Sequence, residues 1–409
     1  MAVKPQTKKI SSKAKTPVRN VSSSADRRSR PRTDDKAKTQ DLIRVKTGID
    51  RPFLIIVLML VAIGTVMVFS SSYAYASSKF EDPYYFAFKQ VVWVFAGTAI
   101  MLFFAYLFDY CWIQKLQMAF FVLAMAAMPL VLVFGVELNE AKRWFQIGPL
   151  SIQPSEFAKL AIILVFSQLI SSGKMKGKPT IIQLLPYLAV GGYMAVNLAL
   201  QPHLSCLVIV GLLMLTLMVF GEVPMKQVII LGIIALAAVA FLIFVLGHAQ
   251  ARIQVWLHPE DYPRNGGWQP LQSLLAIGSG GFWGVGLGQS TQKHLYLPEP
   301  QNDYIFAILC EELGFVFAVI VIGLFVALVW RGIHIAKKAA SIYASLVVIG
   351  IVSQVAIQAL LNIAVVTNTI PSTGISLPFF SYGGTSLITL MAEMGIVLNI
   401  SKYSYVKKG

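Results

Sequence analysis

The chain has 409 residues, of which 56% are apolar and 13% are charged, and its net charge is +15. Soluble globular proteins contain about 25% charged residues, so this chain has too few charges to cover a soluble protein of its size. The comparison excludes a cytosolic enzyme, a secreted disulfide scaffold and a disordered regulator, and it predicts that lipid surrounds most of the chain.

Residues 1–51 hold 15 Lys and Arg side chains against five Asp, a net charge of +10. The segment is rich in Ser, Thr, Pro and Lys and has no apolar run, which predicts a disordered tail. It continues directly into an apolar stretch at Pro52. We therefore expect a cytoplasmic tail that touches anionic lipid headgroups, and not a nucleic-acid-binding arm. The basic region is too long for a signal peptide, and no small-residue cleavage site follows the apolar run.

Ten apolar runs can cross a bilayer as helices, which takes about 20 residues each. They predict an all-α integral membrane domain over residues 52–400. The fourth and tenth runs are short, and the tight boundary at Gln201-Pro202-His203 could also be a break within one helix. The ten runs are Phe53–Ser72, Val91–Phe108, Met118–Gly135, Phe157–Ile170, Ile181–Leu200, Leu204–Phe220, Val228–Gly247, Tyr304–Trp330, Ile342–Val366 and Ser386–Ile400.

The Lys and Arg residues of the loops predict the orientation, because they favour the cytoplasmic side. Three segments each carry a charge of +3: 171–180, 331–340 and the short tail 401–409. Three others each sum to −1: 73–88, 136–156 and 248–303. Ten spans with both termini in the cytoplasm place every positive segment inside.

A large extracytoplasmic loop, 248–303, is predicted between spans seven and eight. Loops longer than about 15 residues without secondary structure are usually functional. Two apolar segments within it, Leu271–Ile277 and Phe282–Leu287, predict short amphipathic helices on the membrane surface. Together with the loops 136–156 and 367–384, it is expected to form the polar extracytoplasmic face.

The stretch Tyr296-Leu-Pro-Glu-Pro-Gln-Asn-Asp-Tyr-Ile-Phe-Ala307 places Glu299 and Asp303 four residues apart at the outer mouth of the eighth span. If Pro300 opens that helix, Asp303 lies in its first turn, close to the membrane plane. The helix dipole and desolvation by lipid shift the pKa of such a carboxylate in opposite directions, which allows a general base to be tuned. The alternative is a carboxylate that only stabilises the helix N-terminus.

Glu311 and Glu312 follow on the same predicted helix, at a depth where ionisable groups are usually functional or paired. Glu311 lies about two turns from Asp303, which would place both on one polar groove. Nearby basic residues could hold a polyanion such as a pyrophosphate, or could simply balance the local acids. These residues are Arg143, Lys142, Lys159, Arg252, Arg264 and Lys293.

A second constellation joins Arg143-Trp144 to Gln153-Pro-Ser-Glu-Phe-Ala-Lys159. Pro154, Ser155 and Glu156 form the pattern of a helix start. Because Glu156 and Lys159 are three residues apart, they could form an ion pair with each other or take part in a site.

No metal or nucleotide site is predicted. The glycine-rich run from Gly278 to Gly288 lacks the preceding strand of a phosphate-binding loop, so its glycines are expected to serve close packing. The five histidines show no metal-ligand spacing, and the three scattered cysteines form neither a disulfide framework nor a metal cluster.

Four motifs together resemble the SEDS family, the polytopic glycosyltransferases of bacterial shape, elongation, division and sporulation. The resemblance covers about Phe53 to Tyr405 and is closer to the division and sporulation branch than to the elongation branch. The motifs are Ser151-Ile-Gln-Pro-Ser-Glu-Phe-Ala-Lys159, Gln289-Ser-Thr-Gln-Lys-His-Leu-Tyr-Leu-Pro-Glu-Pro-Gln-Asn-Asp-Tyr-Ile-Phe-Ala307, Glu311-Glu-Leu-Gly314 and Gly374-Ile-Ser-Leu-Pro-Phe-Phe-Ser-Tyr-Gly-Gly-Thr-Ser386.

The resemblance implies polymerisation of lipid II into glycan strands at the outer face of the bacterial cytoplasmic membrane, at the division septum. The family's catalytic aspartate, four residues after the Pro-Glu pair, corresponds to Asp303. It would deprotonate or orient the 4-hydroxyl of the acceptor GlcNAc, which attacks the lipid-linked MurNAc of the growing strand, and undecaprenyl pyrophosphate leaves.

By the same analogy, the other substrate-binding residues surround the pyrophosphate. Arg143, Lys159 and Lys293 would contact it, with or without a divalent cation such as Mg²⁺ or Mn²⁺. Glu156 and Glu299 would organise the site, and Glu311 would belong to the same groove. The implied partners are a class B penicillin-binding protein (a single-span transpeptidase), other division proteins and membrane lipids, but no nucleic acid.

Two departures from the family pattern stand out. The chain has Gln201-Pro-His-Leu-Ser205 where the family commonly reads Gln-Pro-Asp-Leu-Gly, so His203 changes a charge. It has Ala251-Arg-Ile-Gln-Val-Trp256 where relatives carry Tyr-Arg-Ile followed by basic residues.

Three functions remain open from the sequence: a lipid-linked glycosyltransferase, a lipid II flippase, and a non-catalytic division scaffold. The concentration of polar residues on one face favours the enzyme, because a flippase needs a polar path through the bilayer.

Overall fold

The computed structural model describes residues 42–46, 48–138, 141–148, 150–175, 177–244, 250–262 and 266–407. The chain divides into two units, and the larger, Ile43–Val406, contains all the described helices. The smaller unit lies almost entirely outside the described residues, so the predicted disorder of residues 1–41 is not addressed by the structure.

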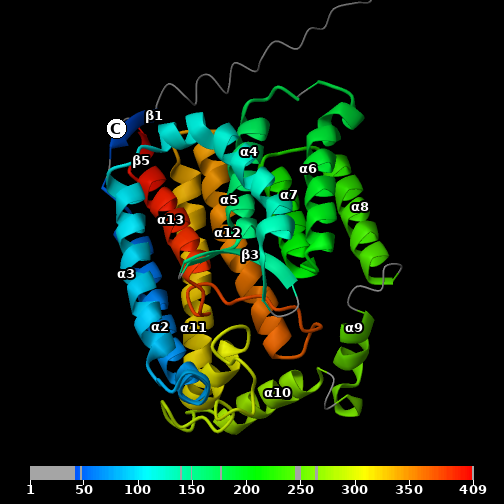
Figure 1. The fold of residues 1–409 in the computed structure, drawn as a ribbon. Helices are drawn as coiled ribbons and strands as arrows, with labels where there is room; N and C mark the ends of the chain where they lie inside the picture. Colours follow the sequence, from blue (N-terminus) through cyan, green and yellow to red (C-terminus); the bar gives the residue numbers. More distant parts are fainter. Residues whose placement is uncertain are drawn as a thin grey trace, which may run out of the picture. The chain divides into compact units, whose positions relative to one another are not determined.

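Ten apolar helices of the described chain correspond one to one with the predicted spans (Figure 1). Nine of these described helices have the length and composition to cross a membrane, whereas α7 has 17 residues and is shorter. The count of ten spans therefore stays a prediction. The helices are α2 (Arg51–Phe80), α3 (Tyr85–Tyr106), α4 (Tyr110–Phe134), α5 (Pro154–Ser171), α6 (Thr180–Leu200), α7 (Leu204–Phe220), α8 (Met225–Phe244), α11 (Ile305–Lys338), α12 (Ile342–Val366) and α13 (Gly384–Ser401).

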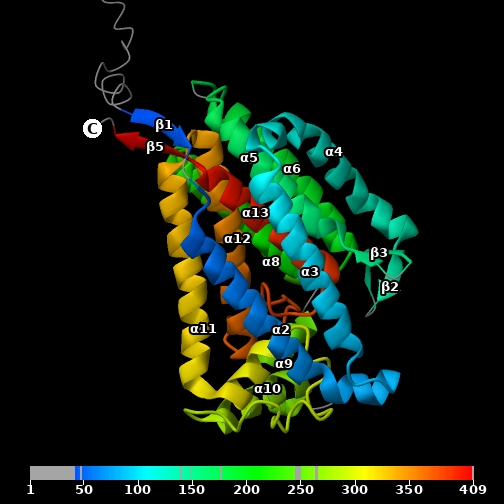
Figure 2. The same cartoon turned by 90° about the vertical axis from the view of Figure 1, so that its left-hand side faces the viewer.

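The first and last of these helices meet at one end of the larger unit (Figures 1 and 2). Asp50 caps α2 by accepting a bond from Phe53 N (3.0 Å), and its own N–H donates to Ser401 Oγ (3.0 Å). Arg331 of α11 binds the same carboxylate in a bidentate pair at 2.9 Å. Both ends of the membrane domain lie on one side of the membrane if the number of spans is even, which is the arrangement that the sequence predicts.

Two strands also form at this end, where the sequence predicted unstructured tails. β1 (Leu42–Lys46) pairs with β5 (Tyr403–Lys407). These two segments are about 360 residues apart in the chain. The sequence of one strand does not show which distant segment pairs with it, so the sequence could not predict this pairing. The segments 1–51 and 401–409 therefore each contain one described strand, and their assignment as cytoplasmic tails stays a prediction.

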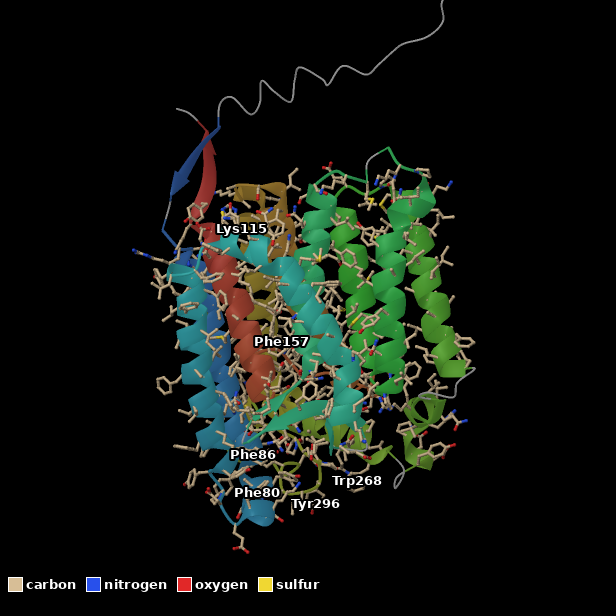
Figure 3. All side chains as sticks on the ribbon, turned by 45° about the horizontal axis from the view of Figure 1, so that its top comes forward. Phe80, Phe86, Lys115, Phe157, Trp268 and Tyr296 are labelled. Atoms are coloured by element: carbon tan, nitrogen blue, oxygen red, sulfur yellow. The ribbon has the colours of Figure 1, made fainter. Side chains whose placement is uncertain are left out.

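The helices that line the interior are distinguished from those at the rim by their burial. α5, α12 and α13 are mostly enclosed, whereas α3 and α8 expose large apolar side chains such as Phe95 and Leu236. Exposed apolar faces on helices of this length are compatible with lipid and not with water. Phe80, Phe86, Trp268 and Tyr296 lie toward one end of the helices and Lys115 lies toward the other (Figure 3). Aromatic side chains are typical of the membrane interface.

A small antiparallel sheet interrupts the predicted all-α architecture. It contains β2 (Val136–Leu138), β3 (Ala141–Ile147) and β4 (Leu150–Ile152) in the order β2-β3-β4. Phe145 pairs with Ile152 and Gln146 with Ser151. These pairs fix the register of β3, the strand that carries Arg143. The sequence predicted a loop between spans here but no strands, because three-residue strands are too short to show alternation.

The loop predicted over 248–303 contains α9 (Gln250–Leu257), the 3-10 turn η1 (Pro259–Asp261) and α10 (Trp268–Gly280). The helix predicted over Leu271–Ile277 is confirmed by α10, which runs across the ends of the spanning helices (Figures 1 and 2). The helix predicted over Phe282–Leu287 is wrong. Gly281, Gly284 and Gly286 have φ angles of 53°, 78° and 107°, which are not helical.

The eighth predicted span is a broken helix. Within α11, Gly314 has φ 77° and ψ 179°, which separates residues 305–313 from 315–338. The glycine-rich loop supplies the missing backbone bonds: Val285 N donates to Glu311 O and Phe315 N donates to Gly281 O, both at 2.9 Å. The glycines of the sequence analysis thus serve close packing, as predicted.

We expect Gly280→Ala to destabilise the protein, because an added Cβ would lie 2.0 Å from the Cys310 carbonyl oxygen of α11. Overpacking of this kind costs about 1–3 kcal/mol. Gly278→Ala, two residues earlier in the same helix, meets nothing within 4 Å and should be neutral or slightly stabilising. Thermal unfolding in detergent compares the two. Equal melting temperatures would contradict the close approach of α10 to α11.

Candidate functional site

A cavity of about 1080 Å³ lies where α5, α7, α10, α11 and α13 begin. Its wall combines the starts of these helices with β3, α9 and the loop 372–383. Five of the seven residues proposed from the sequence line it: Arg143, Glu156, Lys159, Glu299 and Asp303. Segments more than 200 residues apart in the chain are therefore brought to one site.

Asp303 is placed by its backbone, which does not belong to a helix. The carbonyls of Gln301, Asn302 and Asp303 accept bonds from Tyr382 N (2.9 Å), Ser381 Oγ (2.7 Å) and Asn362 Nδ2 (2.7 Å). These three donors come from α12 and the loop after it. Since the carbonyls are bonded across the fold, α11 begins at Ile305. The prediction that Pro300 opens the helix is therefore wrong.

The carboxyl of Asp303 faces the cavity wall beside Gly374. Burial raises the pKa of Asp303 to about 6, and the nearby charge of Glu299 adds to this rise, while Arg143 and Arg252 act in the opposite direction. A pKa close to neutrality suits a group that must take up a proton and release it again.

Glu299 stands beside Asp303 and is fixed by two neighbours. Its carboxylate accepts bonds from Tyr75 Oη of α2 (3.3 Å) and from Asn302 Nδ2 (2.9 Å). Both carboxylate oxygens accept a hydrogen bond. This side chain is therefore better suited to orient neighbouring groups and to add negative charge to the site than to transfer protons.

Lys159 and Glu156, which also line the cavity, form an ion pair with Nζ and Oε1 2.8 Å apart. The Lys159 side chain is 2% exposed and that of Glu156 is 12% exposed. Ser386 of α13 also donates to Glu156 (3.3 Å). The sequence left open whether these two residues form an ion pair or take part in a site. They form the ion pair, and both also line the cavity.

Arg143 reaches from β3 to the junction between α6 and α7. Its guanidinium donates to the carbonyls of Gln201 (2.8 Å for Nε) and Pro202. Burial lowers the pKa of Arg143, and Arg252 lowers it further, yet a guanidinium remains charged at neutral pH. The cationic side chains of the cavity wall are Lys89, Arg143, Lys159 and Arg252.

Five helices begin at this cavity without a side-chain cap. Within the described chain, the N-cap side chains of α5, α7 and α11 accept no capping bond, and the N-cap residues of α10 and α13 are glycines without a side chain. Uncapped helix N-termini present free N–H groups and partial positive charge, which favours anions. Together with the four cations, they make the cavity a place for a strongly anionic group.

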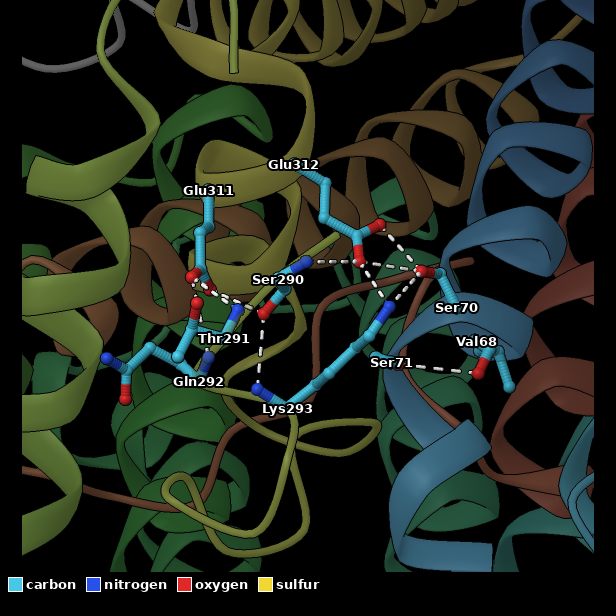
Figure 4. Close-up of polar contacts among 9 residues, drawn as sticks. All are labelled: Val68, Ser70, Ser71, Ser290, Thr291, Gln292, Lys293, Glu311 and Glu312. Carbon is cyan, nitrogen blue, oxygen red and sulfur yellow. Dashed lines mark hydrogen bonds and ion pairs between the residues drawn. The ribbon is translucent and has the colours of Figure 1, made fainter. Parts of the chain in front are cut away.

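Lys293 and Glu311, the other two residues proposed from the sequence, do not line the cavity. They lie in a separate buried cluster near the break in α11 (Figure 4). Lys293 Nζ is 2.8 Å from Glu312 Oε1, and Glu311 accepts from Thr291 N at 2.9 Å. The expectation that Glu311 and Asp303 share one polar groove is therefore wrong, because Glu311 is buried and its carboxylate binds residues 290–292, whereas Asp303 lines the cavity.

His203, the first departure from the family pattern, also lines the cavity. Burial, together with the positive charges of Arg143 and Lys159, lowers the pKa of His203 to about 3, so the imidazole is neutral. Its Nδ1 has no hydrogen-bond partner among the residues that the structure describes. A neutral side chain in place of a carboxylate makes the cavity more positive by one charge.

Two cations of the cavity, and a buried carboxyl of α13 that does not line it, were not selected from the sequence. Arg252 and Lys89 were not selected, although Arg252 had been noted as a basic residue of the outer face. Glu393, in the middle of α13, is 0% exposed and accepts bonds from Gln354 Nε2 at 3.1 and 3.2 Å. A single carboxyl inside an apolar run was a signal that could have been used. Arg264, another basic candidate, lies outside the described residues.

Comparison with known proteins agrees with this geometry. A family model described as a cell cycle protein, covering FtsW, RodA and SpoVE, matches residues 51–406. The chain is 40% identical over 366 residues to stage V sporulation protein E of Bacillus subtilis (strain 168), covering 88% of this chain and 98% of that protein. It is 35% identical over 374 residues to the probable peptidoglycan glycosyltransferase FtsW of the same organism, covering 88% and 93%.

Solved structures show the same fold. One, described as "Structural coordination of polymerization and crosslinking by a peptidoglycan synthase complex", has a TM-score of 0.71 at 25% identity and covers 86% of this chain and 97% of that chain. The rod shape determining protein RodA of Thermus thermophilus has a TM-score of 0.64 at 25% identity, covering 86% and 96%.

Proposed function

Because this chain belongs to the FtsW, RodA and SpoVE family of cell cycle proteins, we propose that it is a peptidoglycan glycosyltransferase that polymerises lipid II. Relatives at 33–35% identity are named probable peptidoglycan glycosyltransferases. The observation that carries the proposal is the cavity itself. It combines four cations and five uncapped helix N-termini with three carboxyls, of which Asp303 has its pKa raised to about 6 by burial.

This combination suits a diphosphate-linked sugar. The anionic leaving group is stabilised by the cations and the helix N-termini, as developing negative charge requires. Asp303 and Glu299 are the carboxyls that the described residues 299–303 contribute to the cavity wall, in addition to the Glu156–Lys159 pair. The position at the start of the inward spans lets sugars lie in water while a lipid tail remains in the bilayer.

The proposed reaction uses Asp303 as the general base. Its carboxylate takes the proton of the acceptor GlcNAc 4-hydroxyl, and that oxygen forms a bond to the anomeric carbon of the lipid-linked MurNAc. The bond from this carbon to the diphosphate oxygen breaks, and undecaprenyl diphosphate leaves with the electron pair. Arg143, Lys159 and Arg252 neutralise the charge of the leaving group.

The described residues do not form a resident metal site, because none of their His, Cys, Asp and Glu side chains gather in groups of three or more able to hold an ion. We derive no step through a bound metal. A divalent cation such as Mg²⁺ or Mn²⁺ is proposed only as a companion of the substrate diphosphate.

Partner and location follow from the relatives. One structural neighbour is described as part of a peptidoglycan synthase complex that coordinates polymerisation and crosslinking. We propose that this chain acts in the bacterial cytoplasmic membrane, at the septum, with a class B penicillin-binding protein and other division proteins. The similarity to a stage V sporulation protein also supports a role in the sporulation branch.

Labelled lipid II supplied to the purified full chain with its partner tests the proposal. A ladder of glycan products supports polymerase activity. If no ladder forms and lipid II moves across the membrane of vesicles that contain the chain, the chain is a flippase and not a polymerase. Absence of both, with the partner still bound, would leave a scaffold.

The pH dependence of the initial rate gives a further prediction. Because the base acts when it is deprotonated and burial raises the pKa of Asp303 to about 6, kcat/KM should rise with pH through about 6 and level off above about 7. Initial rates of polymer formation between pH 5 and 8 measure this limb. A rate that is flat across this range would remove Asp303 from the role of general base.

A further inference from the structure

A buried ionic cluster outside the cavity joins three segments of the chain (Figure 4). We call it the Lys293 cluster, and its members are Ser70 of α2, Ser290 and Lys293 of the loop before Asp303, and Glu311 and Glu312 of α11. All are at most 5% exposed. Such groups are rarely buried without a specific arrangement of partners.

The ammonium of Lys293 has two hydrogen-bond partners within this cluster. Nζ lies 2.8 Å from Glu312 Oε1 and 3.3 Å from Ser70 Oγ, and Ser70 in turn donates to the Glu312 carboxylate at 2.6 and 2.7 Å. The Lys293 side chain is 4% exposed and does not line the cavity. It is therefore not placed to touch a substrate bound there.

Glu311 binds the same loop from the neighbouring position. Its carboxylate accepts bonds from Ser290 Oγ, from Thr291 N at 2.9 Å and from Gln292 N at 3.4 Å. Two consecutive glutamates thus hold one short stretch of loop, one through backbone N–H groups and one through a side-chain charge.

These bonds close a loop of the chain that contains Asp303. The ion pair joins Lys293 to Glu312, and Asp303 lies between them in sequence. From Asp303 the chain enters residues 305–313, a short helix in which Ile305 to Glu312 are all buried. The helical part of this connection, Ile305 to Glu312, is seven steps of 1.5 Å, or about 10 Å long. A rigid buried helix therefore links the cluster to the carboxyl.

We propose that Lys293, Glu311 and Glu312 are positioning residues, which hold the segment 290–303 against α2 and α11 so that Asp303 keeps its place in the cavity wall. This inference rests on the proposed glycosyltransferase activity for its kinetic part. It assigns Lys293 a role through Glu312, in place of a direct contact with the substrate diphosphate.

A double-mutant cycle on the full chain, reconstituted in lipid nanodiscs with its partner, tests the proposal. Lys293→Met and Glu312→Gln each leave one member of the pair without its partner, whereas the double variant removes both charges of the pair and leaves the hydrogen bonds of Glu311 in place. Two readouts are needed: amide hydrogen exchange of residues 294–304, and kcat and KM for labelled lipid II.

We expect each single variant to lose exchange protection in 294–304 and to lower kcat by at least about tenfold, with KM changed less than about twofold. The double variant should recover both protection and kcat to within about threefold of wild type. Arg331→Met is the matched control. It breaks the Arg331–Asp50 pair on the same helix, 2.9 Å in length, and should change neither readout.

Different failures have different meanings. A Lys293→Met variant with normal exchange and raised KM, or a double variant as inactive as Lys293→Met, would overturn the proposal and return Lys293 to the substrate. If wild type forms no glycan but the exchange pattern is as expected, the positioning of 290–303 holds and the glycosyltransferase activity fails.

Discussion

Asp303→Asn should lower the rate of glycan polymer formation by about 10²–10⁴-fold, the usual contribution of a general base. The amide has the shape of the carboxyl but cannot take the proton of an attacking hydroxyl. Burial already disfavours the charged form of Asp303, so the neutral variant should fold at least as well as wild type. Labelled lipid II and partner, with products separated by gel, measure the effect at equal protein amount.

Glu299→Gln is the matched control, because it neutralises the neighbouring carboxyl of the same cavity wall. It should retain most of the activity. Glu299 contributes to the raised pKa of Asp303, so its removal should lower the pKa of Asp303 and shift the acid limb of the pH–rate profile to lower pH. A glycan ladder of normal intensity from Asp303→Asn would show that Asp303 is not the base.

Lys159→Met should weaken the use of lipid II more than any other single change to the cations of the cavity. Lys159 is the buried partner of Glu156 at 2.8 Å, and it also attracts the buried carboxyl of Glu393. Its loss removes a cation from the diphosphate site and leaves Glu156 with no compensating charge nearby. Removal of one partner from a buried pair typically costs about 3–5 kcal/mol of folding stability. Loss of a charged contact to the diphosphate, worth about 1.5–3 kcal/mol, should separately lower kcat/KM by about 10–100-fold.

Two further variants identify the cause of that loss. Lys159→Met/Glu156→Gln removes the uncompensated carboxylate and should recover thermal stability, but not the full affinity for lipid II. Lys174→Met removes an equal charge from an exposed position in the predicted cytoplasmic loop and should have no effect. If the double variant regains wild-type kinetics, Lys159 serves only to neutralise Glu156 and does not contact the diphosphate.

Hydropathy alone predicted the spans of this protein well. The ten runs correspond to ten apolar helices of the described chain, and α12 has the predicted bounds, Ile342–Val366. In a bilayer each helix must satisfy its own backbone hydrogen bonds, so the length and position of a span are written in consecutive residues. The same locality explains why Glu156 and Lys159, one turn apart, could be paired from their spacing.

The candidate site was predictable in part. Arg143, Glu156, Lys159, Glu299 and Asp303 were selected from the sequence and line one cavity. All of them lie at the ends of spans or in the loops that the charge distribution placed outside. Motif similarity selected Asp303, but spacing alone left open whether it had any chemical role.

Hydropathy, charge and motifs were thus enough to predict the membrane class, the positions of the helices and most residues of the polar face. Three features are visible only in the folded chain. Lys293 and Glu311 belong to a separate cluster, α11 is broken at Gly314, and Arg252 and His203 line the same cavity as Asp303. The reason is physical. Spanning helices are apolar on all sides, since lipid and the protein interior are equally apolar, and so their sequence does not show which faces meet. Contacts between distant segments, such as Asn362 with the Asp303 carbonyl, then place the carboxyl.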